Sequence, residues 1–372
     1  MKVPEAIPWL GEAEQAAVSA AVADNWITEG PRSADFSRRL NALFGAEFGV
    51  FAPNGTLALY LGLAALGIRS GDQVLVPDST FIGSANAVIL AGATPVFVEV
   101  GERNFQIDVS KAEHLVTEKT RAIMPVHIYG MVADMNSVVR FAERHQLMII
   151  EDAAQAVGVR YEGRHAGTFG DVGCFSFFAD KTLTTGEGGY VICKEKSTYE
   201  RLSLIRNQGR LERGSFIHPA IGYNFRITDL QAAVGLMQLA KLDEIIARKT
   251  AILDHYHSRL HDVPEVRFLE IEEGSEYVPF RVVLLCREAK SLRSFLTERG
   301  VASRSFFYPL HRQPCFQDLG QERGGPLDLD DQGYPNAVYA YERSVCLPVF
   351  PTLSEPQIEY ICDGVKEFFR CR

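Results

Sequence analysis

The chain has 372 residues, more than a single hydrophobic core usually organises, and its composition is 47% hydrophobic and 23% charged. A formal net charge of −9 excludes the basic surface typical of nucleic-acid-binding proteins, and no apolar stretch is long enough to cross a bilayer. The seven cysteines form no C-x-x-C pair and the first residues carry no signal-peptide pattern. We therefore expect a cytoplasmic protein with reduced thiols and no metal site.

Two helical patterns open the chain, at residues 12–24 and 35–44. Short apolar runs then alternate with helical patterns up to residue 150. Strands are expected at residues 48–52, 73–77, 95–98, 121–126 and 147–150, and helices at 57–66, 84–91 and 135–145. This alternation predicts an α/β fold with a mostly parallel central sheet and helices on both faces, in which ligands bind beyond the carboxyl ends of the strands.

The order of elements changes after Asp152. Two further strands are expected at residues 173–178 and 190–193, and a long helical stretch over 228–261 is suited to join two domains. The rest mixes strands and helices, with strands at 280–285 and 302–307 and helices at 290–299 and 355–369. We expect a large domain over residues 1–245 and a smaller α+β domain over residues 246–372.

One lysine follows an aromatic strand and precedes a glycine-rich turn. The segment Phe175-Ser-Phe-Phe-Ala-Asp-Lys181 leads into Gly186-Glu-Gly-Gly189. Burial at this place would lower the pKa of the Lys181 amine, and a neutral amine can attack a carbonyl to form a Schiff base. A surface lysine on a loop is the other interpretation of the same residues.

Polar side chains also occur where three other predicted elements begin or end. An apolar strand ends at Glu151-Asp152, which suits a ligand-binding acid, a metal ligand or a helix cap. Asn54-Gly-Thr56 stands between a strand and a helix, as a phosphate cradle or an ordinary turn would. Asn224 and Arg226 precede a helix and are suited either to bind an anion or to face water.

Taken together, these segments resemble the DegT/DnrJ/EryC1/StrS family of sugar aminotransferases, which are fold-type I enzymes dependent on pyridoxal 5′-phosphate (PLP). The likeness extends from Trp26 to Pro351 and rests on six markers in the order of the family. They are Asn54-Gly-Thr56, Thr80-Phe-Ile-Gly-Ser-Ala-Asn86, Pro125-Val-His-Ile-Tyr-Gly130, Glu151-Asp-Ala-Ala-Gln155, Phe175-Ser-Phe-Phe178 with Lys181, and Gly222-Tyr-Asn-Phe-Arg226. Each marker is weak alone, whereas six in order form a strong signal.

The resemblance implies roles for the residues around the cofactor ring. Lys181 would bind PLP as a Schiff base and would then move a proton as the general base. Asp152 would pair with the pyridinium nitrogen, so that the ring can take up electrons. Gln155 would donate a hydrogen bond to the 3-oxygen of the ring, and Phe81 would stack on the ring face.

The resemblance also implies a phosphate site and a substrate site. Gly55, Thr56 and Ser176 would hold the phosphate, and Asn224 would reach it from a neighbouring subunit, which implies a homodimer with shared active sites. Five further residues lie in family-like segments and are expected to contact substrate: Thr28, Arg32, His127, Arg226 and His311. Arg32 would meet a diphosphate and Arg226 a carboxylate of the amino donor. A structural role is the alternative for both histidines.

The loop after Lys181 and the segments Phe307-Tyr-Pro-Leu-His311 and Leu347-Pro-Val-Phe-Pro351 resemble the C4-aminating, perosamine-synthase-like branch of the family. The stretch before the Gly-Tyr-Asn marker, residues 210–219, departs from that branch. We therefore expect transfer of an amino group from L-glutamate to C4 of a nucleotide-linked 4-keto-6-deoxy sugar. Amination at C3 and a non-catalytic PLP-fold regulator are the alternatives.

Two other enzyme classes fit the sequence less well. The dehydratases of this family carry histidine where this chain has Lys181. A nicotinamide-dependent oxidoreductase would need a G-x-G-x-x-G turn after the first strand, and the chain has none there.

Overall fold

A computed structural model describes residues 1–370 except 212–213, 215 and 318–329. Within these residues the central sheet has seven strands in the order β1-β9-β8-β5-β4-β2-β3. Only β9 runs antiparallel to its neighbours, so the predicted mostly parallel sheet is confirmed. The strands are β1 (Phe48–Ala52), β2 (Gln73–Pro77), β3 (Thr94–Val98), β4 (Thr120–Ile123), β5 (Met148–Asp152), β8 (Val172–Ser176) and β9 (Gly189–Cys193).

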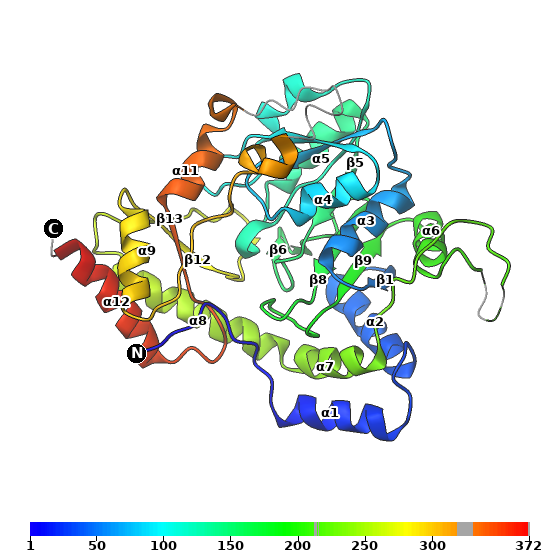
Figure 1. The fold of residues 1–372 in the computed structure, drawn as a ribbon, viewed down its shortest axis with the longest axis horizontal. Coiled ribbons are helices and arrows are strands. Elements are labelled where there is room, and N and C mark those ends of the chain that lie inside the picture. Colours follow the sequence, from blue (N-terminus) through cyan, green and yellow to red (C-terminus); the bar gives the residue numbers. More distant parts are fainter. Residues whose placement is uncertain (212–213, 215, 318–329, 371–372) are drawn as a thin grey trace.

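Helices cover both faces of this sheet (Figure 1), because side chains that alternate along each strand point to opposite faces. In β2, Val74 and Val76 belong to one core, whereas Leu75 between them belongs to the other. The first core includes α3 (Gly55–Leu66) and α4 (Gly83–Leu90). The second includes α2 (Pro31–Phe44), α5 (Met135–His145) and α7 (Asp229–Ala240).

The C-terminal part of the chain has its own core. It is built from α8 (Leu242–Leu260), α9 (Ala289–Glu298), α12 (Glu355–Arg370), β12 (Val282–Leu285) and β13 (Ser344–Leu347). With β10 (Arg267–Phe268), the two longer strands form a sheet in the order β10-β12-β13. Val3 joins this core and pairs with Val301, so the N-terminal segment lies beside the C-terminal elements (Figure 1). A division into two domains near residue 245 stays a prediction.

Shorter elements complete the fold. They are α1 (Glu12–Ala23), α6 (Lys196–Arg206), α11 (Pro335–Arg343), β6 (Arg160–Tyr161), β7 (Arg164–His165) and β11 (Ser275–Glu276). Helix α1 packs along α7, where the Lys241 amine and the Glu14 carboxylate form an ion pair of 2.7 Å. Among the described residues, no helix combines the length and the apolar character that crossing a bilayer requires.

Two expected elements differ from the structure. The single helical stretch over 228–261 is two helices, α7 and α8, because Lys241 leaves the helical conformation (φ −112°, ψ 15°). The expected strand over 302–307 forms no ladder and contributes one isolated bridge, from Arg304 to Cys346. The N–H of Phe306 donates to the Ser344 hydroxyl at 2.6 Å instead of to a neighbouring strand, which explains the loss of regular pairing.

Candidate active site

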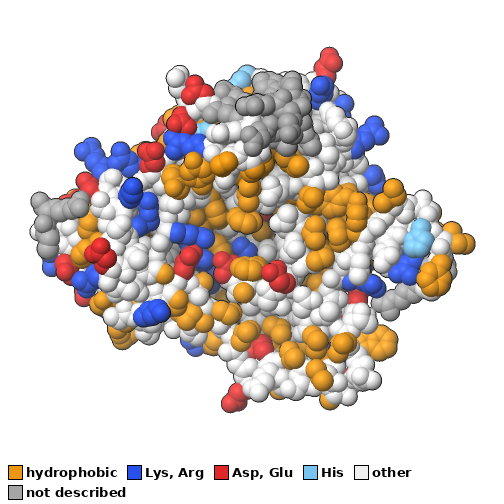
Figure 2. All heavy atoms as spheres, in the orientation of Figure 1, with side chains coloured by type: hydrophobic (Ala, Val, Ile, Leu, Met, Phe, Trp, Pro, Cys, Tyr) orange, Lys and Arg blue, Asp and Glu red, His pale blue; other side chains and the backbone are white. Residues whose placement is uncertain are grey.

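A pocket of about 750 Å³ lies at the carboxyl ends of the central strands, the edge at which the sequence predicts a ligand. Figure 2 shows this face hollowed between the central sheet and the C-terminal elements. Eight of the predicted site residues line the pocket: Gly55, Thr56, Phe81, His127, Asp152, Gln155, Ser176 and Lys181. They come from five separate segments of the sequence, and the fold brings these segments together in one pocket.

Lys181 lies in the loop between β8 and β9, with its side chain against an aromatic ring. Its Nζ is 4.4 Å from the centre of the Phe280 ring and 3.6 Å from Oδ1 of Asp180, which is beyond hydrogen-bond reach. The other oxygen of Asp180 accepts a hydrogen bond of 3.0 Å from Arg281. Burial lowers the pKa of the Lys181 amine, although the Asp180 carboxylate opposes this shift. A buried amine whose pKa is lowered is suited to lose its proton and act as a nucleophile.

Asp152 is the last residue of β5 and is buried at the floor of the pocket. Its Oδ2 accepts a hydrogen bond of 2.7 Å from the Ser84 hydroxyl, and its Oδ1 accepts one of 3.1 Å from the N–H of Ala154. Burial raises the pKa of this carboxyl, and the two hydrogen bonds act against that rise. A cationic ring nitrogen placed beside the carboxylate would supply the counter-charge that a buried anion needs.

The start of α3 forms a cradle for a phosphate. Asn54 caps the helix, since its Oδ1 accepts from the N–H of Leu57 and its carbonyl accepts from the N–H of Ala58. The N–H groups of Gly55 and Thr56 have no acceptor within the helix and are therefore suited to bind an anion. A Cβ on Gly55 would lie 2.8 Å from the Cβ of Ser176, so the close approach of these two segments requires glycine. The residues present fit a phosphorylated pyridine such as PLP.

Two side chains are suited to hold the ring between this cradle and Asp152. The Oε1 of Gln155 accepts a hydrogen bond of 2.6 Å from the N–H of Tyr129, which leaves its amide nitrogen as a donor. Phe81 is 55% exposed although it is apolar, and its ring meets Phe307 edge to face at 5.9 Å. A ring exposed inside a pocket is available for stacking.

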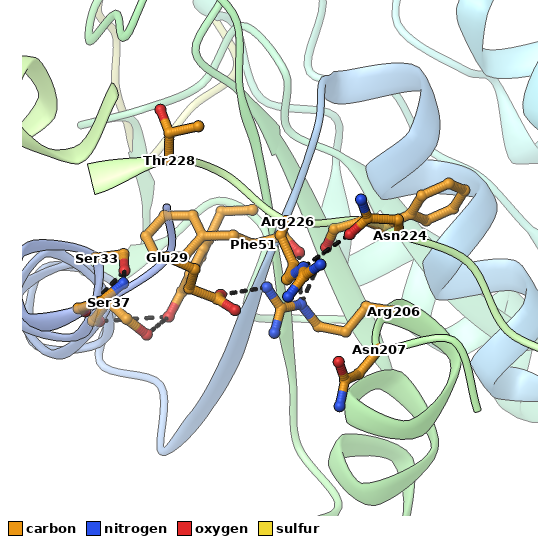
Figure 3. Close-up of polar contacts among 12 residues, drawn as sticks. Glu29, Ser33, Ser37, Phe51, Arg206, Asn207, Asn224, Arg226 and Thr228 are labelled. Carbon is orange, nitrogen blue, oxygen red and sulfur yellow. Dashed lines mark hydrogen bonds and ion pairs between the residues drawn. The ribbon is translucent and has the colours of Figure 1, made fainter. Parts of the chain in front are cut away.

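Asn224 and Arg226 lie outside the lining of this pocket. The Oδ1 of Asn224 accepts a hydrogen bond of 2.7 Å from Nε of Arg226, and the pair lies beside Arg206 (Figure 3). Arg206 in turn forms an ion pair with Glu29 and donates to the carbonyl of Phe51 at 3.0 Å. The two predicted residues therefore contact each other within one chain and do not reach its own phosphate cradle.

Thr28 and Arg32 also lie outside the lining of this pocket. Thr28 is exposed, and Arg32 forms an ion pair of 2.5 Å with Asp24. The Asp229 carboxylate accepts from the N–H groups of Arg32 and Ser33 and so holds the start of α2. Asp229 thus fixes the loop over residues 26–32, while Thr228 caps α7 by accepting from the N–H of Gln231.

The two histidines are buried, and only one of them lines the pocket. The Nε2 of His127 lies 2.9 Å from the Glu151 carboxylate and its Nδ1 accepts from the N–H of Ala133, so both ring nitrogens are used below the pocket. His311 lies away from the pocket between the carboxylates of Asp78 and Asp331, at 2.7 and 3.0 Å. These contacts favour the structural alternative for each of them.

Sequence reasoning missed several residues that line the pocket, among them Ser84, Glu187, Phe280 and Arg304. Ser84 lies inside the marker Thr80–Asn86, so its place in that marker was the signal that could have predicted it as a site residue. Arg304 is the one charged residue of the expected strand 302–307, and a charge at that place was the available signal. Its Nε lies 2.9 Å from Oε1 of Glu5, and its guanidinium lies 5.4 Å from the centre of the Phe307 ring.

Comparison with known proteins agrees with this geometry. Residues 8–366 match the DegT/DnrJ/EryC1/StrS aminotransferase family. GDP-perosamine synthase of Escherichia coli O157:H7 is 37% identical over 99% of this chain and 98% of its own length. UDP-N-acetyl-3-dehydro-alpha-D-glucosamine 3-aminotransferase of Acidithiobacillus ferrooxidans is 35% identical over 87% of this chain and 85% of its own.

Among solved structures, that of Spr1654 from Streptococcus pneumoniae in its PMP form superposes with a TM-score of 0.93. The two chains are 26% identical, and the match covers 100% of this chain and 99% of the other. The fold is thus shared over the full length, including the pocket and the C-terminal core.

Proposed function

We propose that this chain, which belongs to the DegT/DnrJ/EryC1/StrS aminotransferase family, moves an amino group from L-glutamate to C4 of a nucleotide-linked 4-keto-6-deoxy sugar. That it is a PLP-dependent sugar aminotransferase follows from the family and from the relatives. The observation that carries the proposal is the pairing of Lys181 and Asp152 in one pocket with a phosphate cradle.

PLP, when bound, supplies an electron-accepting ring that lets a carbon beside the amino group lose its proton. The residues of the chain would hold it at three points. Lys181 would hold it covalently, Asp152 would keep the ring nitrogen protonated, and the N–H groups of Gly55 and Thr56 would bind the phosphate with the Ser176 hydroxyl. Each of these residues lines the same pocket.

Lys181 would serve as the general base in both halves of the reaction. Its amine, released when the amino donor takes its place, accepts the proton that leaves the α-carbon of the donor. In the second half it would deliver a proton to C4 of the sugar, which as a carbonyl carbon has no hydrogen of its own, and would take up a proton from the amine form of the cofactor in exchange. The lowered pKa of this buried amine suits the role, because a lysine of ordinary pKa would stay protonated at neutral pH.

A cationic group in the pocket supports an anionic amino donor. Arg304 lines the pocket, and Glu5 is the carboxylate that pairs with it. A guanidinium binds a carboxylate through two parallel hydrogen bonds. We assign the donor carboxylate to Arg304, because it is a guanidinium that lines the pocket within the same chain.

Asn224 and Arg226 would act in the pocket of a second copy of the chain. The loop between α6 and α7, in which both residues lie, carries highly exposed apolar side chains such as Leu211, Phe216 and Ile221, and Phe216 is 86% exposed. The described residues of this loop project from the body of the molecule (Figure 1). Exposed apolar side chains gathered in one segment mark a protein interface, which supports a homodimer with shared sites.

The position of amination is supported by the relatives. The 37% identical relative is a GDP-perosamine synthase, whereas the name of the 35% identical relative specifies a 3-aminotransferase. The loop Thr182-Leu-Thr-Thr185 after the lysine favours the C4 branch. Amination at C3 is therefore the second candidate.

The test is a substrate panel. Protein loaded with PLP is incubated with L-glutamate and, separately, with nucleotide-linked 4-keto and 3-keto hexoses, and the products are identified by mass spectrometry and NMR. A 4-amino sugar formed with 2-oxoglutarate is the expected result. A 3-amino product supports the second candidate, and failure of glutamate to convert PLP into its amine form contradicts both.

A further inference from the structure

Lys249 of α8 is a buried amine that the proposed reaction does not use. Its side chain is 2% exposed, and its Nζ donates a hydrogen bond of 2.9 Å to the hydroxyl of Thr182, the residue that follows Lys181. The nearby carboxylate of Asp180 is engaged elsewhere, since it lies 3.6 Å from Lys181 and 3.0 Å from Arg281. Lys249 is thus an amine with a polar contact to the loop of Lys181 and no ion pair among the described residues.

The ring of Phe280 lies amid three basic side chains. The Nζ of Lys181 is 4.4 Å from its centre, the Nζ of Lys249 is 5.8 Å away, and the guanidinium carbon of Arg281 is 4.2 Å away. A small cavity of about 20 Å³ is lined by both lysines, Asp180 and Thr182. That volume holds one water molecule, with polar groups of the lining to bind it. The two amines therefore share one buried, polar compartment.

The charges around Lys249 oppose its protonation. Burial lowers the pKa of its amine to about 7, Arg281 and Lys181 act in the same direction, and Asp180 acts against them. The remaining charges of the cluster are Glu5 and Arg304, and Glu5 bridges Arg281 and Arg304 at 3.1 and 2.9 Å. The charge of Lys249 consequently changes near neutral pH, the range in which Lys181 must exchange protons.

We propose that Lys249 is a positioning residue for amino transfer, which fixes the Lys181 loop through Thr182 and, when charged, favours the neutral, proton-accepting form of the Lys181 amine. The inference rests on the proposed role of Lys181. The physical reason is that two like charges in a compartment of low dielectric disfavour each other. A fixed charge at position 249 weakens Lys181 as a base, and loss of that charge strengthens it.

The test follows the titration of both amines in the whole protein. Protein labelled with ¹³C at lysine Cε is loaded with pyridoxamine 5′-phosphate, a form in which Lys181 is a free amine, and the Cε shifts are followed against pH. The variants are Lys249→Arg, which keeps the charge, and Lys249→Met, which removes it at similar length. Lys241→Met, which removes the lysine paired with Glu14, is the control.

The expected result is an order of midpoints for Lys181. The midpoint in Lys249→Arg lies about one pH unit below that in Lys249→Met, and the wild type and Lys241→Met lie between them. The lower limb of the kcat–pH profile moves in the same order, with little change in KM. Equal Lys181 midpoints in the Arg and Met variants would overturn the proposal, because a packing role does not depend on charge.

A measurement on the wild type covers the case in which a variant fails to fold. Coupled amines titrate in two macroscopic steps, so the Lys181 shift is expected to show a second inflection near pH 7, where Lys249 titrates. A single inflection at Lys181 contradicts the inference. Borohydride reduction of the PLP form separates the two claims, because an adduct on Lys181 upholds its role even when its titration ignores Lys249.

Discussion

The pocket floor and the segment that precedes α7 differ in one respect: whether a single chain places their functional groups in its own pocket. At the floor, Asp152 has hydrogen bonds from Ser84 and Ala154, and the helix cap, the cradle and Lys181 all belong to the same chain. In the segment around Asn224, the side chains of Asn224 and Arg226 contact each other, within a loop that carries highly exposed apolar side chains. The groups at the floor are brought together within one chain, whereas Asn224 and Arg226 lie outside the pocket of their own chain.

This difference separates cofactor binding from substrate selection. Burial and hydrogen bonds of a single chain fix the groups that would hold PLP, whatever the sugar is. The groups that would choose the sugar lie on loops and, in our proposal, across a subunit interface. Variants of the two regions should therefore fail in different ways.

The largest effect is expected at the floor, from Lys181→Ala. Loss of both the covalent attachment and the general base should reduce kcat by more than about 10⁴-fold, the upper range for general-base catalysis alone. Steady-state kinetics with saturating PLP and glutamate measure this. The far-UV circular dichroism spectrum should be unchanged, and Lys366→Ala, at a half-buried lysine of α12 paired with Asp262, should keep full activity. Turnover retained in Lys181→Ala would remove the lysine from the mechanism.

A smaller loss is expected when the acid below the ring is neutralised. Asp152→Asn keeps the shape of the side chain and removes its charge, and it should lower kcat by about 10²- to 10³-fold. Ser84→Ala, which removes only the hydrogen bond to that carboxylate, should cost less. Kinetics of both half-reactions by stopped-flow absorbance give the comparison. An Asn variant as active as wild type would mean that the ring nitrogen has another partner.

Mixing two inactive variants tests whether the second region works across an interface. Asn224→Ala and Lys181→Ala homodimers are each expected to be weak or inactive. Random mixed dimers contain one site with both residues intact, so the mixture should regain about one quarter of the wild-type activity. Subunits are exchanged under mild denaturation, and activity is assayed before and after. If Asn224 served the pocket of its own chain, mixing would restore nothing.

The smallest effect concerns stability, away from the pocket. Burial opposes protonation of His311, yet the Asp78 and Asp331 carboxylates raise its pKa above the ordinary value near 6.5. A raised pKa in the folded state stabilises the fold fully below pH of about 6.5, and this contribution is lost as pH rises through the folded-state pKa. His311→Gln should therefore lower the free energy of unfolding by about 2 kcal/mol at pH 6 and by less at pH 9. Urea unfolding at the two pH values measures it, and an equal loss at both would disprove the ion pairs.

The sequence predicted the sheet, and the residues expected at the floor of the site line one pocket, because both depend on local patterns. Alternation along β2 and the cap at Asn54 can be read from neighbouring residues. The ion pairs around Arg281 could not be predicted, since they join residues as far apart as Glu5 and Asp180. Residues 210–219, the stretch that departs from the pattern of the C4-aminating branch, include positions 212, 213 and 215, which lie outside the described residues.

The most direct test of the whole account is chemical trapping of the cofactor. Protein incubated with PLP is reduced with borohydride, digested and mapped by tandem mass spectrometry. The account predicts a phosphopyridoxyl group on one peptide only, at the side chain of Lys181. A modification at another lysine such as Lys249, or none at all, would contradict it.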